Sequence, residues 1–185
     1  MKFEIIETER LFLRKLSPAV LNDLFKNYSE EIIRKELALF TDAAYIKEKY
    51  RYVKGYEMYN KSMLYFQMMD KNTKQIIGSC GYYTWFTDHM RAEIGYSLYE
   101  DEHKGKGLMT EVMQPILEYG FNVMNLHRVE ALISPDNTPS LKLVKKFHFK
   151  EEGFLRQHYF ANDEFTGSLL FGLLKMEAKE HGIIK

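Results

Sequence analysis

The segment from residue 91 to residue 111 passes from a strand pattern through a glycine-rich turn into a helix pattern. Residues 91–99 alternate between apolar and polar or small side chains, which predicts a strand. After Lys104-Gly105-Lys106-Gly107, apolar residues recur at helical spacing as far as Met124, although Pro115 should cost this helix a hydrogen bond and kink it. A strand joined to a helix in this way must pack against it, so the chain is expected to form layers of both kinds of element.

The same periodicities predict further elements on both sides of this segment. Gly95, inside the strand over 91–99, indicates either a bulge or a close backbone approach. The predicted strands are 10–15, 63–70, 75–83, 91–99, 128–133, 149–160 and 166–176, the last two joined around Asn162-Asp163. The predicted helices are 19–28 after Ser17-Pro18, a short helix that begins at 29–31, a longer one from Thr41-Asp42 to about Asn60, 107–124, and 139–147 after Asp136-Asn137. Residues 84–90 are predicted to form an aromatic-rich loop. This order predicts an α/β sandwich with a mixed sheet, formed as a single domain over 1–185.

Charge and cysteine content exclude some classes of protein. Lys plus Arg and Asp plus Glu both number 26, so the chain lacks the basic excess of a nucleic-acid-binding protein. Cys80 is the sole cysteine, so no internal disulfide can form, and there is no His/Cys cluster to bind a metal. No apolar run approaches the ~20 residues that cross a bilayer, and the N-terminus lacks a signal-peptide core. We therefore expect a cytoplasmic protein with no nucleic-acid or membrane partner.

The turn Lys104-Gly105-Lys106-Gly107 has the composition of an anion-binding site. The first amides of the following helix lack intrahelical partners, and glycine allows a phosphate to approach the backbone closely. A nucleotide-binding P-loop is excluded because Leu108, not Ser or Thr, follows Gly107, and a dinucleotide fingerprint would need a third glycine. On the glycines alone, a helix entry with no ligand remains an equal alternative.

The segment resembles the cofactor motif of the GNAT superfamily of acetyltransferases, Arg/Gln-x-x-Gly-x-Gly/Ala. Lys104, Gly107 and Met109 fall on its specified positions, with Lys in place of Arg or Gln and Met in place of the small residue. The Met variant resembles ribosomal-protein serine/alanine N-terminal acetyltransferases. The segments 8–14, 137–149 and 152–156 are similar to other motifs of that subfamily, so the resemblance spans nearly the whole chain.

The resemblance implies a GNAT-like, mostly antiparallel central sheet of about seven strands flanked by helices. It also implies acetyl-CoA as co-substrate, held mainly by backbone amides of the turn and first helical residues. Free backbone groups where the strand over 91–99 splays from its neighbour would pair with the pantetheine arm, Asn137 would cap its helix or contact that arm, and Ser140 would lie near the sulfur. The implied binding residues are Ser97, Leu98, Tyr99, Lys104, Gly105, Lys106, Gly107, Leu108, Met109, Thr110, Asn137 and Ser140.

Two residues are expected to take part in catalysis. Glu93 lies eleven residues before Lys104, where the superfamily often has the base that deprotonates the amine; a solvated glutamate or an ion pair with Arg91 or Arg128 is the alternative. The superfamily often has a Tyr acid seven residues after Asn137, but Val144 stands there. Ser140 or a water must then protonate the thiolate, or the thiolate leaves unaided; a Ser140 bonded to its own helix is equally compatible.

The acceptor amine is left open by the sequence. The leading hypothesis is a protein or peptide N-terminus, held by Tyr83, Trp85 and Phe86 in the aromatic loop and by Tyr159 and Phe160 before the last hairpin. Acetylation of a small amine such as a polyamine or an aminoglycoside is the second hypothesis. A non-catalytic acyl-CoA sensor or interaction module is the third, and the oligomeric state, including a homodimer, is open.

Overall fold

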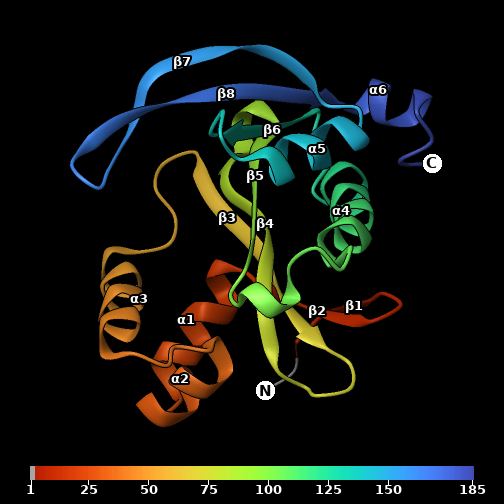
Figure 1. Cartoon of the computed structure of the whole chain (residues 1–185). Helices are drawn as coiled ribbons and strands as arrows, with labels where there is room; N and C mark the ends of the chain where they lie inside the picture. Colours follow the sequence, from red (N-terminus) through yellow and green to blue (C-terminus); the bar gives the residue numbers. More distant parts are fainter. Residues whose placement is uncertain (1–2) are drawn as a thin grey trace.

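A computed structural model describes residues 3–185, and its centre is one twisted sheet of eight strands (Figure 1). The sheet order is β1-β2-β3-β4-β5-β6-β8-β7, and among the described residues β5 and β6 form the one parallel pair. The strands are β1 Ile5–Glu7, β2 Leu11–Leu16, β3 Lys61–Asp70, β4 Ile76–Phe86, β5 Arg91–Leu98, β6 Arg128–Ile133, β7 Lys150–Ala161 and β8 Glu164–Leu174. The predicted mixed, mostly antiparallel sheet is confirmed, with one strand more than expected.

Helices cover the two faces of the sheet differently. One hydrophobic core lies between the sheet and α4 and α5, and a second lies between the sheet and α1, α2 and α3. No helix within residues 3–185 is long and apolar enough to cross a membrane. The helices are α1 Pro18–Asn27, α2 Glu30–Leu37, α3 Asp42–Lys54, α4 Leu108–Glu118, α5 Thr138–Lys146 and α6 Lys175–Glu180, with 3-10 turns at Thr87–His89 and Asp101–His103.

The predicted helix starts are confirmed by their capping geometry. Ser17, Thr41 and Asn137 each accept a hydrogen bond from the backbone amide three residues ahead, which satisfies one of the orphan donors of the first turn. Pro18 follows its cap at the first helical position, where its missing N–H costs nothing. The sequence signals for these starts are local, which is why they could be read without tertiary information.

Several predicted boundaries were wrong. The helix expected to reach Asn60 ends at Lys54, because Gly55 adopts a φ of 89°. Residues 84–86, predicted as loop, continue strand β4. The predicted helix over 107–124 is α4 only to Glu118, followed by a π-helical turn over Tyr119–Val123. Strand β1 and helix α6 were not predicted.

The π-helical turn has a cause on the neighbouring strand. The buried hydroxyl of Tyr82 on β4 donates a hydrogen bond of 2.9 Å to the carbonyl of Ile116. A side-chain group that enters the backbone ladder of a helix widens or bends it at that point. Pro115 itself does not end α4, which runs three residues beyond it.

Candidate active site

The parallel strands β5 and β6 pair at one end and separate along the rest of their length. Their pairing covers Arg91–Glu93 on β5 and Arg128–Glu130 on β6, and Glu93 opposite Glu130 is the last pair. Beyond it, β5 continues to Leu98 and β6 to Ile133 without pairing to one another. The expected splay of β5 from its neighbour is therefore confirmed, and it begins immediately after Glu93.

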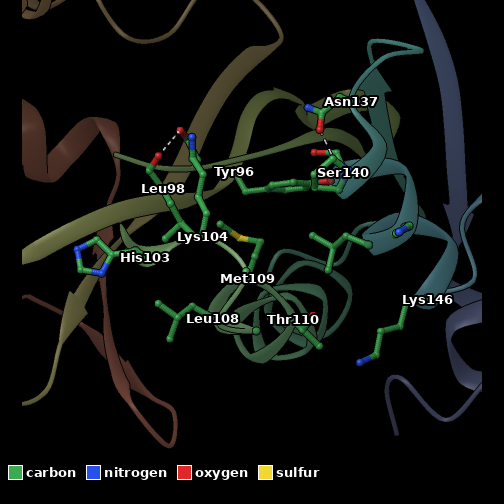
Figure 2. Close-up of a pocket in the computed structure, with 16 residues that line it drawn as sticks. Tyr96, Leu98, His103, Lys104, Leu108, Met109, Thr110, Asn137, Ser140 and Lys146 are labelled. Atoms are coloured by element: carbon green, nitrogen blue, oxygen red, sulfur yellow. Dashed lines mark hydrogen bonds between the residues drawn. The ribbon is translucent and has the colours of Figure 1, made fainter. Parts of the chain in front are cut away.

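A pocket of about 660 Å³ lies against β5 beyond this split (Figure 2). Its walls come from β5, the glycine turn, the start of α4 and the exposed face of α5. Two of the predicted binding residues, Tyr99 and Lys106, do not line it, and neither does Glu93. Ten do line it: Ser97, Leu98, Lys104, Gly105, Gly107, Leu108, Met109, Thr110, Asn137 and Ser140.

The glycine turn leaves backbone amides at the start of α4 without side-chain caps beside this pocket. Gly105 and Gly107 have φ of 72° and 76°, a left-handed conformation that favours glycine. Gly107 is the N-cap of α4 and provides no side-chain cap, so the first amides of the helix are left for a ligand. The Lys104 ammonium instead pairs with Asp101 at 2.5 Å.

Helix α5 forms the opposite wall. The Asn137 side chain accepts from the Ser140 amide at 3.2 Å, so its predicted capping role is confirmed. Val144 is wholly buried in the core and supplies no hydroxyl to the pocket. Two cations that were not predicted, Lys142 and Lys146, line the pocket from one side of this helix. Their spacing of four residues is a sequence signal that could have identified them.

Glu93 lies on the other face of β5 from the pocket. Its neighbours Ala92 and Ile94 are buried in the core beneath α4, so alternation places Glu93 on the opposite face. Burial raises the pKa of Glu93 above its ordinary value; nearby Glu130 adds to the rise, whereas a hydrogen bond with Thr84 and the proximity of His158 oppose it.

The ion pairs considered for Glu93 are made by a different carboxylate. Arg91 and Arg128 both contact Glu130, at 2.6 Å and 2.8 Å. Glu93 makes no ion pair within residues 3–185. It is a partly buried carboxylate with a raised pKa, at the point where β5 and β6 separate.

Tyr83, Trp85 and Phe86, predicted to lie in a loop, belong to β4, and their rings are distributed over both faces of the sheet. Tyr83 is the extra residue of a bulge in β4, and its ring lies so close to Gly95 that a Cβ there would come within 2.7 Å of Tyr83 Cδ2. This identifies Gly95 as a site of close approach, with the bulge on the opposing strand. Phe86 stacks under Arg91 on the Glu93 face, whereas Trp85 packs against the core beneath α4.

The face that carries Glu93 is lined by further aromatic side chains. Tyr65 stacks on Tyr83 with 5.3 Å between ring centroids, and the Tyr83 hydroxyl donates to Ser79 at 2.7 Å. Tyr159, on β7, is near enough for the Glu93 charge to raise its pKa, although burial is the larger cause. Phe160, also predicted here, packs against Phe165 at the exposed hairpin. Among residues 3–185, no three His, Cys, Asp or Glu side chains are arranged to hold a metal ion.

Comparisons with known proteins point to one kind of enzyme. Residues 10–150 match the family model described as acetyltransferase (GNAT) domain. The chain is 34% identical, over 94% of its length and 98% of the relative's, to a Bacillus licheniformis protein named uncharacterized N-acetyltransferase p20.

Two solved structures share the fold. A mutant spermidine/spermine N-acetyltransferase from Vibrio cholerae superposes with a TM-score of 0.70 at 21% identity, covering 94% of this chain and 98% of that one. A ribosomal-protein-S5-alanine acetyltransferase from Vibrio fischeri does so with a TM-score of 0.65 at 23% identity, covering 92% and 96%. At these identities the likeness is one of fold, and it does not choose between the two acceptors.

Proposed function

This chain belongs to the GNAT acetyltransferase family, and from that premise we propose that it transfers the acetyl group of acetyl-CoA to the amine at the N-terminus of a protein or peptide. The observation that carries the proposal is Glu93. It is the last β5 residue paired with β6, and it stands on the face opposite the pocket. A base on one side of the split and a co-substrate pocket on the other is the arrangement that direct acetyl transfer requires.

The residues around the pocket fit acetyl-CoA. Amides at the start of α4, with Lys142 and Lys146 across the pocket, suit its phosphates. At Ser97 and Leu98, β5 is paired with β4 but not with β6, so its edge toward β6 offers backbone groups to the amides of an extended arm. Acetyl-CoA supplies an activated acetyl thioester, and the chain's own residues hold and orient it.

Glu93 is proposed to accept the proton of the attacking amine, directly or through a water. An ammonium has no lone pair, so its proton must leave before the carbon–nitrogen bond forms and the carbon–sulfur bond breaks. The raised pKa of Glu93 brings its proton affinity closer to that of the amine than an exposed glutamate's would be. Ser140, in the pocket wall, is proposed to contact the sulfur.

The charges beside Glu93 favour a peptide N-terminus over a polyamine. A polyamine carries several ammonium groups and needs several free carboxylates. On this side of the sheet Glu48 is paired with Arg51 at 2.9 Å through Oε2, while its buried Oε1 has no partner within residues 3–185, and Glu130 is paired with Arg91 and Arg128. The aromatic pair Tyr65 and Tyr83 offers instead a surface for the side chains of an extended peptide. We place this activity in the cytoplasm, with residues 1–185 acting as one domain.

The test is release of free thiol from acetyl-CoA with panels of peptides, polyamines and aminoglycosides. Turnover with peptides alone supports the proposal, and turnover with small amines alone overturns its acceptor. Tight acetyl-CoA binding without turnover on any panel would identify a sensor. Glu93→Gln should lower kcat by about 100-fold or more while acetyl-CoA affinity is kept. The exposed Glu151→Gln on β7 is the control and should behave as the parent protein does.

A further inference from the structure

Tyr96 has a buried hydroxyl that no group of the described chain satisfies. It lines the pocket from β5, and its oxygen has no hydrogen-bond partner within residues 3–185. Figure 2 shows its ring extending from the strand toward Ser140 on α5. A buried hydroxyl left without a partner destabilises the folded state, so its retention calls for an explanation. Because Tyr96 lines the pocket, a bound ligand is a candidate partner for this hydroxyl.

The position of Tyr96 relative to Glu93 identifies which part of the ligand it meets. The two residues are three apart on β5, or about 10 Å of strand, and therefore point to opposite faces of the sheet. Glu93 stands where the amine must lose its proton, at the end of the split. Tyr96 stands on the pocket face, between that point and the glycine turn that suits the phosphates. A thioester that reaches the split from the pocket has its sulfur on the Tyr96 side.

Val144, wholly buried on α5, has no hydroxyl to offer the site. Tyr96 and Ser140 are two hydroxyl-bearing side chains of the pocket wall that lie close to one another (Figure 2). The Ser140 side chain lies near enough to hydrogen-bond the Tyr96 hydroxyl and so opposes the rise in the Tyr96 pKa, although the two hydroxyls do not reach hydrogen-bonding geometry in the structure. The Tyr96 hydroxyl therefore keeps a hydrogen to donate to a ligand.

We infer that the Tyr96 hydroxyl donates a hydrogen bond to the sulfur of the co-substrate and stabilises the thiolate as it leaves. The inference rests on the proposed acetyl transfer. When the carbon–sulfur bond breaks, its electron pair stays on sulfur, and the hydroxyl meets the new negative charge without bond rearrangement. Tyr96 is then a catalytic residue on β5, in a site where α5 has Val144 and no tyrosine.

Tyr96 acts as a hydrogen-bond donor and keeps its proton. Burial raises the pKa of Tyr96 to about 12, and Ser140 only partly opposes the rise. A thiol has a pKa of about 8.5, so transfer of the proton from Tyr96 to the thiolate would be uphill. The proton that the amine loses passes to Glu93 and then to solvent, and the thiolate takes a proton from water after release.

The experiment titrates the thiol of bound CoA by the ultraviolet absorbance of the thiolate, in the parent protein and in Tyr96→Phe. If Tyr96 donates, the bound thiol in the parent has a pKa about one unit below that of free CoA, and Tyr96→Phe returns it toward the free value. Ser140→Ala, which leaves Tyr96 in place, keeps most of the shift. The exposed Tyr50→Phe on α3 is the control. In turnover, Tyr96→Phe should lower kcat by about 10- to 100-fold with the KM for acetyl-CoA unchanged.

An identical bound-thiol pKa in Tyr96→Phe and the parent overturns the inference, and a shift lost only in Ser140→Ala assigns the role to Ser140. Tyr96→Phe removes a hydroxyl that bonds to nothing in the described chain, so it should fold at least as stably as the parent. Failure of the proposed function looks different. A parent protein that binds CoA but acetylates no amine loses the acetyl transfer, while the titration still decides whether Tyr96 meets the sulfur. A parent that does not bind CoA overturns both.

Discussion

The Arg10 guanidinium connects the glycine turn to the helix that follows it, through an ion pair with Glu111 in which Nε and Oε2 lie 2.6 Å apart. The same guanidinium donates to the Lys106 carbonyl at 2.9 Å, and the Arg10 amide donates to Glu111 Oε1 at 2.7 Å. The Thr8 hydroxyl also donates to Glu111, at 2.6 Å. The β1–β2 turn therefore braces the backbone that is proposed to hold the phosphates.

Arg10→Ala is expected to weaken acetyl-CoA binding without affecting the chemistry. Loss of the brace lets the turn at Lys106 relax, which should raise the Kd by about fivefold, on the order of 1 kcal/mol for one exposed charge-assisted contact. Calorimetric titration measures the Kd, and kcat at saturating acetyl-CoA should stay within about twofold. Arg34→Ala, which removes an exposed arginine paired with Glu30 and Asp42 away from the pocket, is the control. Equal effects of the two variants would contradict a specific brace.

Glu93→Gln is expected to stabilise the fold at neutral pH while it removes activity. The folded-state pKa of Glu93 lies above its ordinary value of 4.5, so between these two pH values the folded protein binds the extra proton. Stability from this group therefore falls as the pH rises through that window, and the cost persists at neutral pH. Urea unfolding should give Glu93→Gln a higher free energy of unfolding than the parent at pH 7, and no such advantage at pH 4. A variant less stable than the parent at pH 7 would contradict the assigned burial of the charge.

The same raised pKa should appear in the pH dependence of turnover. Glu93 is a base only when it is ionised, so kcat/KM should fall as the pH drops through the folded-state pKa, at a pH above 4.5. A pH profile of kcat/KM for the parent protein measures this fall at low pH. Glu93→Gln should not show the fall, and a variant that keeps it would show that another group causes it.

Gly120→Ala is expected to destabilise the junction between α4 and β4. A Cβ at this position would lie 2.0 Å from the Tyr82 hydroxyl, which holds the Ile116 carbonyl. The cost should be about 2–4 kcal/mol of unfolding free energy by urea titration. The loss of unfolding free energy caused by Gly120→Ala should be smaller in a Tyr82→Phe background, because the hydroxyl that the new Cβ would meet first is then absent. Gly153→Ala is the matched control, because a Cβ there meets nothing within 4 Å; strictly additive costs would argue against the contact.

Cys80 is expected to be silent in the thiol-release assay. Its side chain is wholly buried in the core, and burial raises the pKa of its thiol far above the ordinary value. A thiol reagent needs an accessible thiolate. The folded protein should therefore give no signal with such a reagent before acetyl-CoA is added, and one thiol per chain after denaturation in urea. Rapid labelling of the native protein would contradict the burial of Cys80.

Much of the site was predictable because its signals are local in the sequence. The left-handed turns need Gly105 and Gly107, the helix caps need Ser17, Thr41 and Asn137, and each of these acts over three or four residues. Ten of the twelve predicted binding residues line one pocket because the turn and the two helix starts carry most of them. Their assigned roles in binding and catalysis remain predictions.

Other features depend on which segments lie side by side. Strand β1 has only three residues, too few to show alternating hydrophobicity in the sequence. It forms because it pairs with the edge of β2. The bulge at Tyr83 follows from the register against β5, and the brace from Arg10 joins residues a hundred positions apart.

The sequence alone determined that a strand, a glycine turn and a helix would follow one another and leave the first helical amides without side-chain caps, because backbone conformation there is set by residue type. The tertiary structure decided which side chains stand at each side of the split. It put the end of the β5–β6 pairing at Glu93, three residues before Tyr96 on the same strand. It also buried the Tyr96 hydroxyl without a partner, which no pattern of residue types could show, because burial is a property of what packs around a side chain.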